Sequence, residues 1–340
     1  MPQSKFYLTK RRNGVYYILI KTPQQKNRWK STHCRKKPEA MRFFKGFEEQ
    51  CGKLKNIHIP TFSEFLKVYE SIQATAIRKS TLELYKFMAT RFIRLNSDKP
   101  LNEYTSLEFE QSRAKEIASG VSVTRMNMYT RAIKTLFNFA FKQNIISRNP
   151  LENIKQIKQP KSLPTYFSIA DLEKILALVT NPVLRDIYIT AFYTGMRISE
   201  ILNLRWVNVD LQKKQIRVCN SEDFVTKTGT ERTIPIHPKV SEMLSKIDKS
   251  QEYVFSKNGV YRYTRNYVSN RFKHYATKAG LPKNIKLHSA RHSFASLCVQ
   301  SGVDIYAVKS LLGHSNITTT QIYSHLSSHS LQDSINKLPS

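Results

Sequence analysis

The N-terminal hydrophobic pattern predicts a small antiparallel sheet followed by a helix. Three short runs alternate apolar with polar residues, and turn residues at Asn13-Gly14 and at 22–27 separate them. Such alternation between turns is typical of a strand meander. Pro38, at an early helical position, and the apolar spacing after it predict a helix across one sheet face. The runs are KFYLTKRR, GVYYILIK and RWKSTHC, and the apolar helix positions are Met41, Phe43, Phe44 and Phe47.

Helical periodicity dominates the second segment. Apolar residues recur at i, i+3, i+4 and i+7 from Phe62, a second series follows Ser80 as its predicted N-cap, and a longer helix is marked from Met126. We interpret residues 60–150 as an all-α bundle of four or five helices, whose aromatic stripes form its core. Pro150 ends this pattern because proline disfavours a helical residue before it.

A polar, basic stretch separates this bundle from a third segment. Residues 151–166 contain NIKQIKQPKSLPTY, whose lysines and prolines are typical of an extended linker between domains. From 167 to 340, helices resume after Ser168 and again from Tyr263. Between them lie three strand candidates, in 206–220, 223–230 and 231–238.

The predicted fold class is therefore multidomain. It comprises a small β-sheet plus helix in residues 1–56, an all-α helical bundle in 60–150, an interdomain linker in 151–166, and a mixed, mainly-α domain with a small antiparallel sheet and a C-terminal tail in 167–340.

The charge of the chain indicates what kind of partner it binds. The chain has 340 residues with 55 Lys+Arg against 25 Asp+Glu, a net charge of +30. Solubility needs only about 2–8 net charges in a small domain, so the excess favours a polyanionic partner whose phosphates the surface neutralises. No apolar run approaches the ~20 residues of a membrane span, and the N-terminus lacks a signal peptide, which predicts a cytoplasmic protein. The four cysteines are far apart and are predicted to be reduced thiols, with neither disulfides nor a zinc ribbon.

The third segment carries an ordered series of polar motifs. Each residue taken alone has an ordinary explanation, such as a surface ion pair for an Arg-Glu pair at i, i+3. Together they form a constellation, because H-x-x-R on a helix places both side chains on one face, where they can reach the same anion. The residues are Arg197 and Glu200 in TGMRISE, Lys227 in TKTG, His288 and Arg291 in LHSARHSFA, His314 in LLGHS, and Tyr323 in TTTQIY.

In these motifs, in this order across residues 194–323, the chain resembles the tyrosine recombinase or phage integrase family. All six family catalytic positions are present without substitution: Arg197, Lys227, His288, Arg291, His314 and Tyr323. For Glu200 the resemblance implies a supporting role beside an active-site cation; its alternative is a plain surface carboxylate. Upstream, the bundle is similar to the family's core-site-binding domain, and the N-terminal sheet to an arm-type DNA-binding domain.

The chemistry of these side chains fits phosphodiester cleavage. Arg197 and Arg291 offer guanidinium forks for non-bridging phosphate oxygens. His288 and His314 add donors or move protons. A tyrosine with its ordinary pKa of ~10 needs a cationic pocket to become a nucleophile, and Lys227 on a hairpin is a candidate general acid for the leaving oxygen.

The resemblance implies a site-specific recombinase that integrates or excises a mobile element or prophage. The DNA would be held as a 3′-phosphotyrosyl intermediate, with no ATP, metal or other cofactor. Related roles stay open: a Xer-like chromosome-dimer resolvase, a DNA invertase, or a type IB topoisomerase. A non-catalytic, sequence-specific DNA-binding regulator is the alternative of a different class, although such a protein would not require Tyr323 or Lys227. A zinc site at His288 and His292 is disfavoured because Ser289 replaces the glutamate of H-E-x-x-H.

The expected partner is double-stranded DNA, at core-type and arm-type sites. Strand exchange between two duplexes needs four cut strands, so we expect a tetramer on DNA assembled from monomers, with an accessory bending or excision factor left open. The tail after Tyr323 is weakly amphipathic, and two hypotheses remain: it docks on a neighbouring protomer, or it folds back on its own domain. Its apolar residues are Leu326, Leu331, Ile335 and Leu338.

Overall fold

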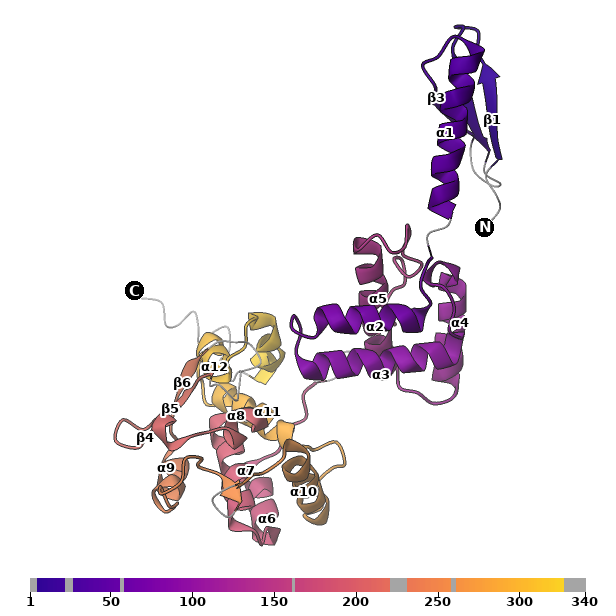
Figure 1. Cartoon of the computed structure of the whole chain (residues 1–340). Helices are drawn as coiled ribbons and strands as arrows, with labels where there is room; N and C mark the ends of the chain where they lie inside the picture. The colour runs from indigo at the N-terminus through magenta and orange to yellow at the C-terminus, as the bar shows by residue number, and fades with distance from the viewer. Residues whose placement is uncertain are drawn as a thin grey trace, which may run out of the picture. The chain divides into compact units, whose positions relative to one another are not determined.

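The computed structural model describes residues 5–21, 27–55, 58–160, 163–220, 231–257 and 261–326. The chain divides into two compact units, Met1–Pro160 and Lys161–Ser340, and each is described here by itself (Figure 1). The division falls inside the predicted linker. The C-terminal tail beyond Leu326 lies outside the described residues, so both hypotheses for it stay open.

The N-terminal sheet and helix form as predicted. Strands β1 (Lys5–Lys10), β2 (Tyr16–Lys21) and β3 (Arg28–Ser31) pair antiparallel in that order, and α1 (Lys37–Lys55) lies along the sheet in Figure 1. Ile18 is fully buried, and the rings of Phe6 and Phe47 meet edge to face with centroids 5.3 Å apart. Apolar residues that alternate along the strands thus give the sheet one face for the helix to cover.

Four α-helices make up the bundle that follows: α2 (Phe62–Gln73), α3 (Lys79–Asn96), α4 (Ser106–Ala118) and α5 (Val123–Lys142). Capping boxes at Thr61 and Thr105 begin α2 and α4, where a hydroxyl and a glutamate satisfy free helix N–H groups. The predicted aromatic stripes are buried: Phe62, Phe92 and Phe137 pack ring against ring in the core.

The first half of the predicted linker packs on this bundle. Leu151 is fully buried and Ile154 nearly so. The Asn127 side chain exchanges hydrogen bonds of 2.8 and 2.9 Å with the backbone of Ile157. Apolar residues spaced three apart at Leu151, Ile154 and Ile157 were the signal for this packing within an otherwise polar stretch.

Over its described residues, the C-terminal unit is mainly helical with two small sheets. Its β4–β5–β6 sheet corresponds to the predicted strand cluster, although the candidate at 223–230 lies outside the described residues. The β7–β8 pair was not predicted. The helices are α6 (Ile169–Leu178), α7 (Pro182–Thr194), α8 (Ile198–Leu202), α9 (Pro238–Ser245), α10 (Arg265–Lys278), α11 (Leu287–Gln300) and α12 (Ile305–Leu312), and the strands are β4 (Val209–Asp210), β5 (Gln215–Val218), β6 (Arg232–Pro235), β7 (Ser256–Lys257) and β8 (Tyr261–Arg262).

Helix α11 lies at the centre of this unit. It packs along α7 and against α10 and α12, and the fully buried Ser293 hydroxyl accepts a 2.9 Å hydrogen bond from the backbone N–H of Phe167. Short 3₁₀ turns, η3 (Ile317–Thr319) and η4 (Gln321–Leu326), follow α12 and bring the chain back onto α11. Motifs far apart in the sequence therefore meet at one end of α11.

Among the described residues, no helix combines the length and apolar character that a bilayer span requires. Among the cysteines whose side chains are described, Cys34, Cys219 and Cys298 are free thiols.

Candidate active site

Glycine ends the helix that leads into the TGMRISE motif. Gly195 caps α7 in the left-handed conformation, at φ +62°. A Cβ there would lie 2.5 Å from Cδ1 of Phe294 and 2.9 Å from Cδ2 of Leu312. The tight reversal turns the Gly195 carbonyl toward α11, where it accepts a 2.7 Å hydrogen bond from Arg291 Nη1, and it places Arg197 at the start of α8.

Glu200 is a buried carboxylate held by two arginines. Its side chain is 1% exposed. Oε1 accepts hydrogen bonds from Arg197 Nη1 at 2.9 Å and from Arg232 Nη1 at 3.1 Å. Oε2 accepts from the Arg197 backbone N–H at 2.8 Å and from Arg232 Nη2 at 2.7 Å. The supporting role inferred for Glu200 remains a proposal, but this geometry contradicts the alternative of a plain surface carboxylate.

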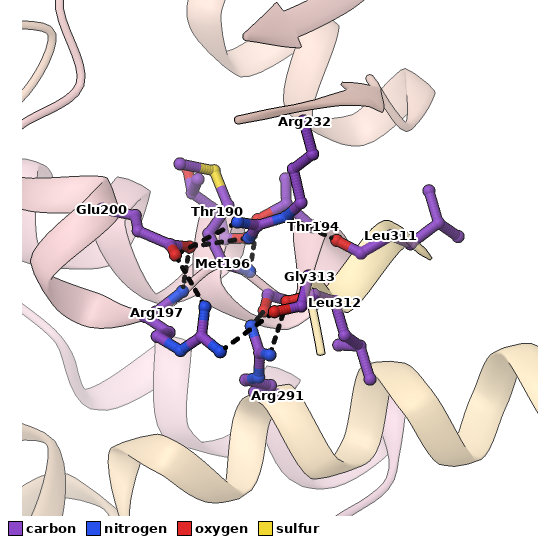
Figure 2. A network of polar contacts seen from close by, with 11 residues as sticks. Thr190, Thr194, Met196, Arg197, Glu200, Arg232, Arg291, Leu311, Leu312 and Gly313 are labelled. Carbon is purple, nitrogen blue, oxygen red and sulfur yellow. Dashed lines mark hydrogen bonds and ion pairs between the residues drawn. The ribbon is translucent and has the colours of Figure 1, made fainter. Parts of the chain in front are cut away.

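Three arginines also converge on the C-terminal end of α12 (Figure 2). The helix ends at Gly313, with φ +65°, and the N–H groups of Gly313 and His314 close the last turn on Ser310 and Lys309. The next three carbonyls each accept a hydrogen bond from a different guanidinium. These bonds are Arg232 Nε to Leu311 O at 2.8 Å, Arg291 Nη2 to Leu312 O at 2.6 Å, and Arg197 Nη2 to Gly313 O at 3.3 Å.

The C-terminal end of a helix favours guanidinium groups for a physical reason. The last carbonyls of a helix lack backbone donors and carry the negative end of its dipole, so they favour cations. The carbonyls fix where each guanidinium lies, and the same turn positions His314 directly after Gly313. The three guanidinium groups, held by backbone carbonyl oxygens, thus form a cationic site, called here the pocket.

Tyr323 lies in this pocket, on η4. It is 2% exposed, and its hydroxyl contacts Nδ1 of His292 on α11. Burial raises the pKa of Tyr323 to about 12, and the charge of Arg291 acts in the opposite direction. The phenol is therefore neutral in the free protein at pH 7, with a histidine nitrogen in place to exchange its proton.

The two predicted histidines contact other residues around the site. The ring of His288 meets that of His292 edge to face, with centroids 5.0 Å apart, and His314 Nδ1 is 2.9 Å from the Thr320 hydroxyl. Burial and the charges of Arg291 and Arg197 lower the pKa of His314 to about 4. Partial burial, His292 and the same arginines lower the pKa of His288. Both imidazoles are neutral at pH 7.

Neighbouring arginines favour the ionised form of Glu200, whereas Arg197 disfavours the charge of Arg291. Burial alone would raise the pKa of Glu200, but hydrogen bonds and charge from Arg232 and Arg197 lower it below its usual range. Burial and the neighbouring Arg197 lower the pKa of Arg291 to about 9. At pH 7 Glu200 is therefore a carboxylate and Arg291 a guanidinium cation.

The structure brings five of the six predicted catalytic residues together: Arg197, His288, Arg291, His314 and Tyr323. Lys227 lies outside the described residues. Within the described ranges no group of three His, Cys, Asp or Glu side chains is placed to hold a metal ion, and His292 contacts Tyr323.

Two residues of the pocket, Arg232 and His292, were not assigned to it from the sequence. Arg232 had a readable signal, because it precedes Ile234 and Ile236 at period two, and both are buried. An arginine on the inward face of a strand requires a buried partner. His292 entered the sequence analysis only through the zinc alternative, and its contact with the Tyr323 hydroxyl is seen in the structure alone.

Comparison with known proteins assigns the family. The model of the phage integrase family matches residues 169–329. Tyrosine recombinase XerA of Pyrococcus horikoshii is 30% identical over 268 residues, covering 76% of this chain and 87% of the relative. ICEBs1 integrase of Bacillus subtilis is 24% identical over 319 residues, covering 86% and 85%.

Solved structures share the fold at low sequence identity. A lambda integrase dimer bound to a COC′ core site has a TM-score of 0.69 at 20% identity, covering 93% of this chain and 94% of that one. A lambda integrase tetramer bound to a Holliday junction gives 0.68 at 20% identity, covering 94% of each. The family model and the XerA relative define a class of enzyme that cleaves and joins DNA. The chain belongs to the phage integrase family of tyrosine recombinases.

Proposed function

We propose that this tyrosine recombinase is an integrase that moves a mobile element or prophage by cutting and rejoining DNA through a 3′-phosphotyrosyl intermediate. The observation that carries the proposal is the buried Tyr323 hydroxyl, which contacts His292 in the pocket that contains Arg291 and Arg197. A tyrosine placed this way has no evident use in a protein that only binds DNA.

In the proposed reaction the arginines bind the scissile phosphate. A guanidinium has five N–H groups, and two hydrogen bonds hold each of Arg197 and Arg291 in the pocket. The remaining N–H groups bind the non-bridging oxygens, whose charge grows in the transition state. His288 and His314, neutral and at the same pocket, donate further hydrogen bonds to these oxygens.

The phenol of Tyr323 attacks phosphorus after losing its proton. His292 is the acceptor in contact with that hydroxyl, and a phosphate bound beside the arginines completes the environment in which phenolate forms. The 5′-oxygen leaves with a proton from Lys227, whose role as general acid stays a prediction from the sequence. A 5′-hydroxyl of a partner strand then attacks the phosphotyrosyl bond and releases Tyr323. The reaction needs no ATP or metal, since the phosphodiester energy is kept in the protein–DNA bond.

We further propose that the N-terminal sheet binds arm-type DNA, which favours an integrase over a Xer-type resolvase. Strand alternation places Tyr7, Leu19 and Trp29 in one cross-strand row on the face opposite α1. Tyr7 and Trp29 are 43% and 42% exposed. The Arg11 guanidinium lies 4.1 Å from the centre of the Trp29 ring. Exposed rings and cations on a small sheet suit contacts with phosphates and groove edges.

The proposed assembly is a tetramer on DNA, formed from monomers. Two duplexes exchanging strands contain four scissile phosphates, and each needs its own Tyr323. Lambda integrase, which shares the fold, has been solved as a tetramer on a Holliday junction. The bundle of α2–α5 is proposed to bind the core site together with the catalytic unit.

A suicide duplex tests the proposed reaction. Its sequence comes from the junction between the element and its host DNA, with a nick that lets the cleaved end diffuse away. We expect purified protein to form an SDS-resistant adduct in EDTA without ATP, and Tyr323→Phe to form none while still binding the duplex. A partner duplex added to the wild type then separates strand exchange from relaxation. Specific binding without any adduct would favour the regulator.

A further inference from the structure

We propose that Arg232 is a positioning residue that holds Arg197 and His314 in the geometry that phosphate cleavage requires. The inference rests on the function proposed above and adds a residue that lies outside the sequence motifs. Arg232 opens β6, and its side chain is 9% exposed. Figure 2 shows it reaching from the strand to both Glu200 and the end of α12.

The hydrogen bonds of the Arg232 side chain are made to other residues of the protein. Nη1 and Nη2 form a fork on the two carboxylate oxygens of Glu200, at 3.1 and 2.7 Å, and Nε donates to Leu311 O at 2.8 Å. Three of its five N–H groups are thus used inside the protein. This distinguishes Arg232 from a phosphate ligand: it acts through the residues it holds.

Through Glu200, Arg232 fixes Arg197. The carboxylate has about four lone-pair sites; two accept from Arg232, and two accept from the side chain and the backbone N–H of Arg197. Without the Arg232 fork, Glu200 is free to rotate about its last torsion and to pull Arg197 away from the phosphate. Arg197 would then be a cation compensating a buried carboxylate instead of a cation available to DNA.

Through Leu311, Arg232 also fixes the turn that carries His314. Its Nε bond lies three residues before that histidine, and Gly313 is so close that a Cβ there would be 3.0 Å from Cδ and Nη1 of Arg232. The same α12 end is bonded by Arg197 at Gly313 O. One guanidinium therefore sets the spacing between α8 and α12, the two elements that present Arg197 and His314.

Lysine cannot replace this arginine. A lysine ammonium is a point charge without a planar fork, so it cannot satisfy both oxygens of Glu200 and a carbonyl with the same geometry. Arg232→Lys retains the charge beside Glu200, and it serves as the informative variant where Arg232→Gln fails to fold. The matched control is Arg217→Lys on the neighbouring strand β5, whose exposed side chain pairs with Glu231 at 2.8 Å.

The test compares cleavage of two suicide duplexes by the full-length protein. One has an ordinary scissile phosphate, and the other has a methylphosphonate there, in which a methyl group replaces one charged oxygen. Adduct formation is timed at saturating protein, with duplex binding and thermal unfolding measured in parallel. A group that acts through the phosphate-binding arginine matters less when the phosphate is uncharged.

We expect Arg232→Lys to slow adduct formation on the phosphodiester about 100-fold, the size of effect that a misplacement of about 1 Å causes. Binding and Arg217→Lys cleavage should stay within about threefold of wild type. On the methylphosphonate the loss should shrink to less than about tenfold. Equal losses on both duplexes, or no loss on the phosphodiester, would overturn the positioning role. Absence of any adduct with wild type would instead contradict the proposed function itself.

Discussion

The three guanidinium groups at the end of α12 show how single residues set the protonation of their neighbours. Burial, together with the charges of Arg291 and Arg197, lowers the pKa of His314 to about 4. An unfolded histidine has a pKa near 6.5. The imidazole is therefore neutral in the folded protein throughout the range in which the unfolded chain binds a proton.

This difference predicts a pH dependence of stability. Between pH 6.5 and 4 the unfolded state binds more protons than the folded state, so the free energy of unfolding decreases as the pH falls through this range. Because His314 is only partly buried, we expect it to contribute roughly 1–3 kcal/mol between pH 7 and 4. His288 titrates in the same direction, whereas Glu200, whose pKa is lowered, loses its contribution at more acidic pH.

Denaturant unfolding of wild type and His314→Gln, from pH 4.5 to 7.5, measures this contribution. The variant should show a shallower decrease toward acid than wild type. Equal slopes for the two proteins would show that the His314 proton does not contribute to stability.

At the residue scale, the sequence predicted which side chains carry the chemistry, but it did not predict all of their contacts. The motif residues could be found because their order and spacing are local features of the chain. Arg232 pairs with Glu200 across 32 positions, and His292 contacts Tyr323 across 31. Such pairings depend on how β6 and η4 return to α8 and α11, which no local pattern specifies. Lys227 lies outside the described residues, so its assignment rests on the sequence alone.

At the scale of elements, two glycine-ended helices organise the pocket. Gly195 ends α7 and Gly313 ends α12, both in the left-handed conformation. The carbonyls that these ends expose are those that accept hydrogen bonds from the arginines. No local pattern in the sequence indicated that Phe294 and Leu312 would pack over Gly195.

Gly195→Ala should therefore destabilise the C-terminal unit. The left-handed conformation costs a residue with a Cβ about 1–2 kcal/mol, and overpacking against Phe294 adds about 1–3. We expect a loss of about 2–5 kcal/mol, measured by denaturant unfolding. Gly46→Ala is the control, since that glycine is in helix α1 with no atom within 4 Å of the new Cβ. It should be stabilising by about 1 kcal/mol or less. Equal effects at the two glycines would contradict the role assigned to Gly195.

The sequence was least informative where elements are short or where a polar stretch packs. Strands β7 and β8 have two residues each, too few to show alternation. Leu151 and Ile154 attach the start of the predicted linker to the bundle because two buried side chains outweigh the polar residues around them. Long amphipathic helices and the N-terminal meander were predictable because their periodicity extends over many residues.

At the scale of the whole molecule, the most informative feature is the net charge of +30. Residues 1–55 alone contain 15 Lys+Arg and 3 Glu. Neutralising phosphates releases counterions, so binding of DNA should weaken steeply as salt rises. The family assignment and the charge thus agree on the same partner, for which the N-terminal sheet is the additional surface proposed above.

A full-length variant tests the arm-type role of that sheet. Trp29→Ala combined with Arg11→Gln should remove nuclease protection at sites distant from the cleavage point on element-end DNA. Adduct formation on a short core duplex should be unchanged within about twofold. Arg42→Gln, on the exposed side of α1, is the matched charge control and should retain the protection. Loss of core cleavage alone, with distant protection intact, would contradict an arm-binding sheet.

The central claim is that Tyr323 becomes covalently joined to the 3′ end of cleaved DNA. The most direct measurement is mass spectrometry of the adduct after nuclease and protease digestion, combined with 5′-end labelling of the released strand. We predict a nucleotide attached through a 3′-phosphate to Tyr323 and a released strand with a free 5′-hydroxyl. Attachment to another residue, or a 5′-phosphate on the released strand, would contradict the account.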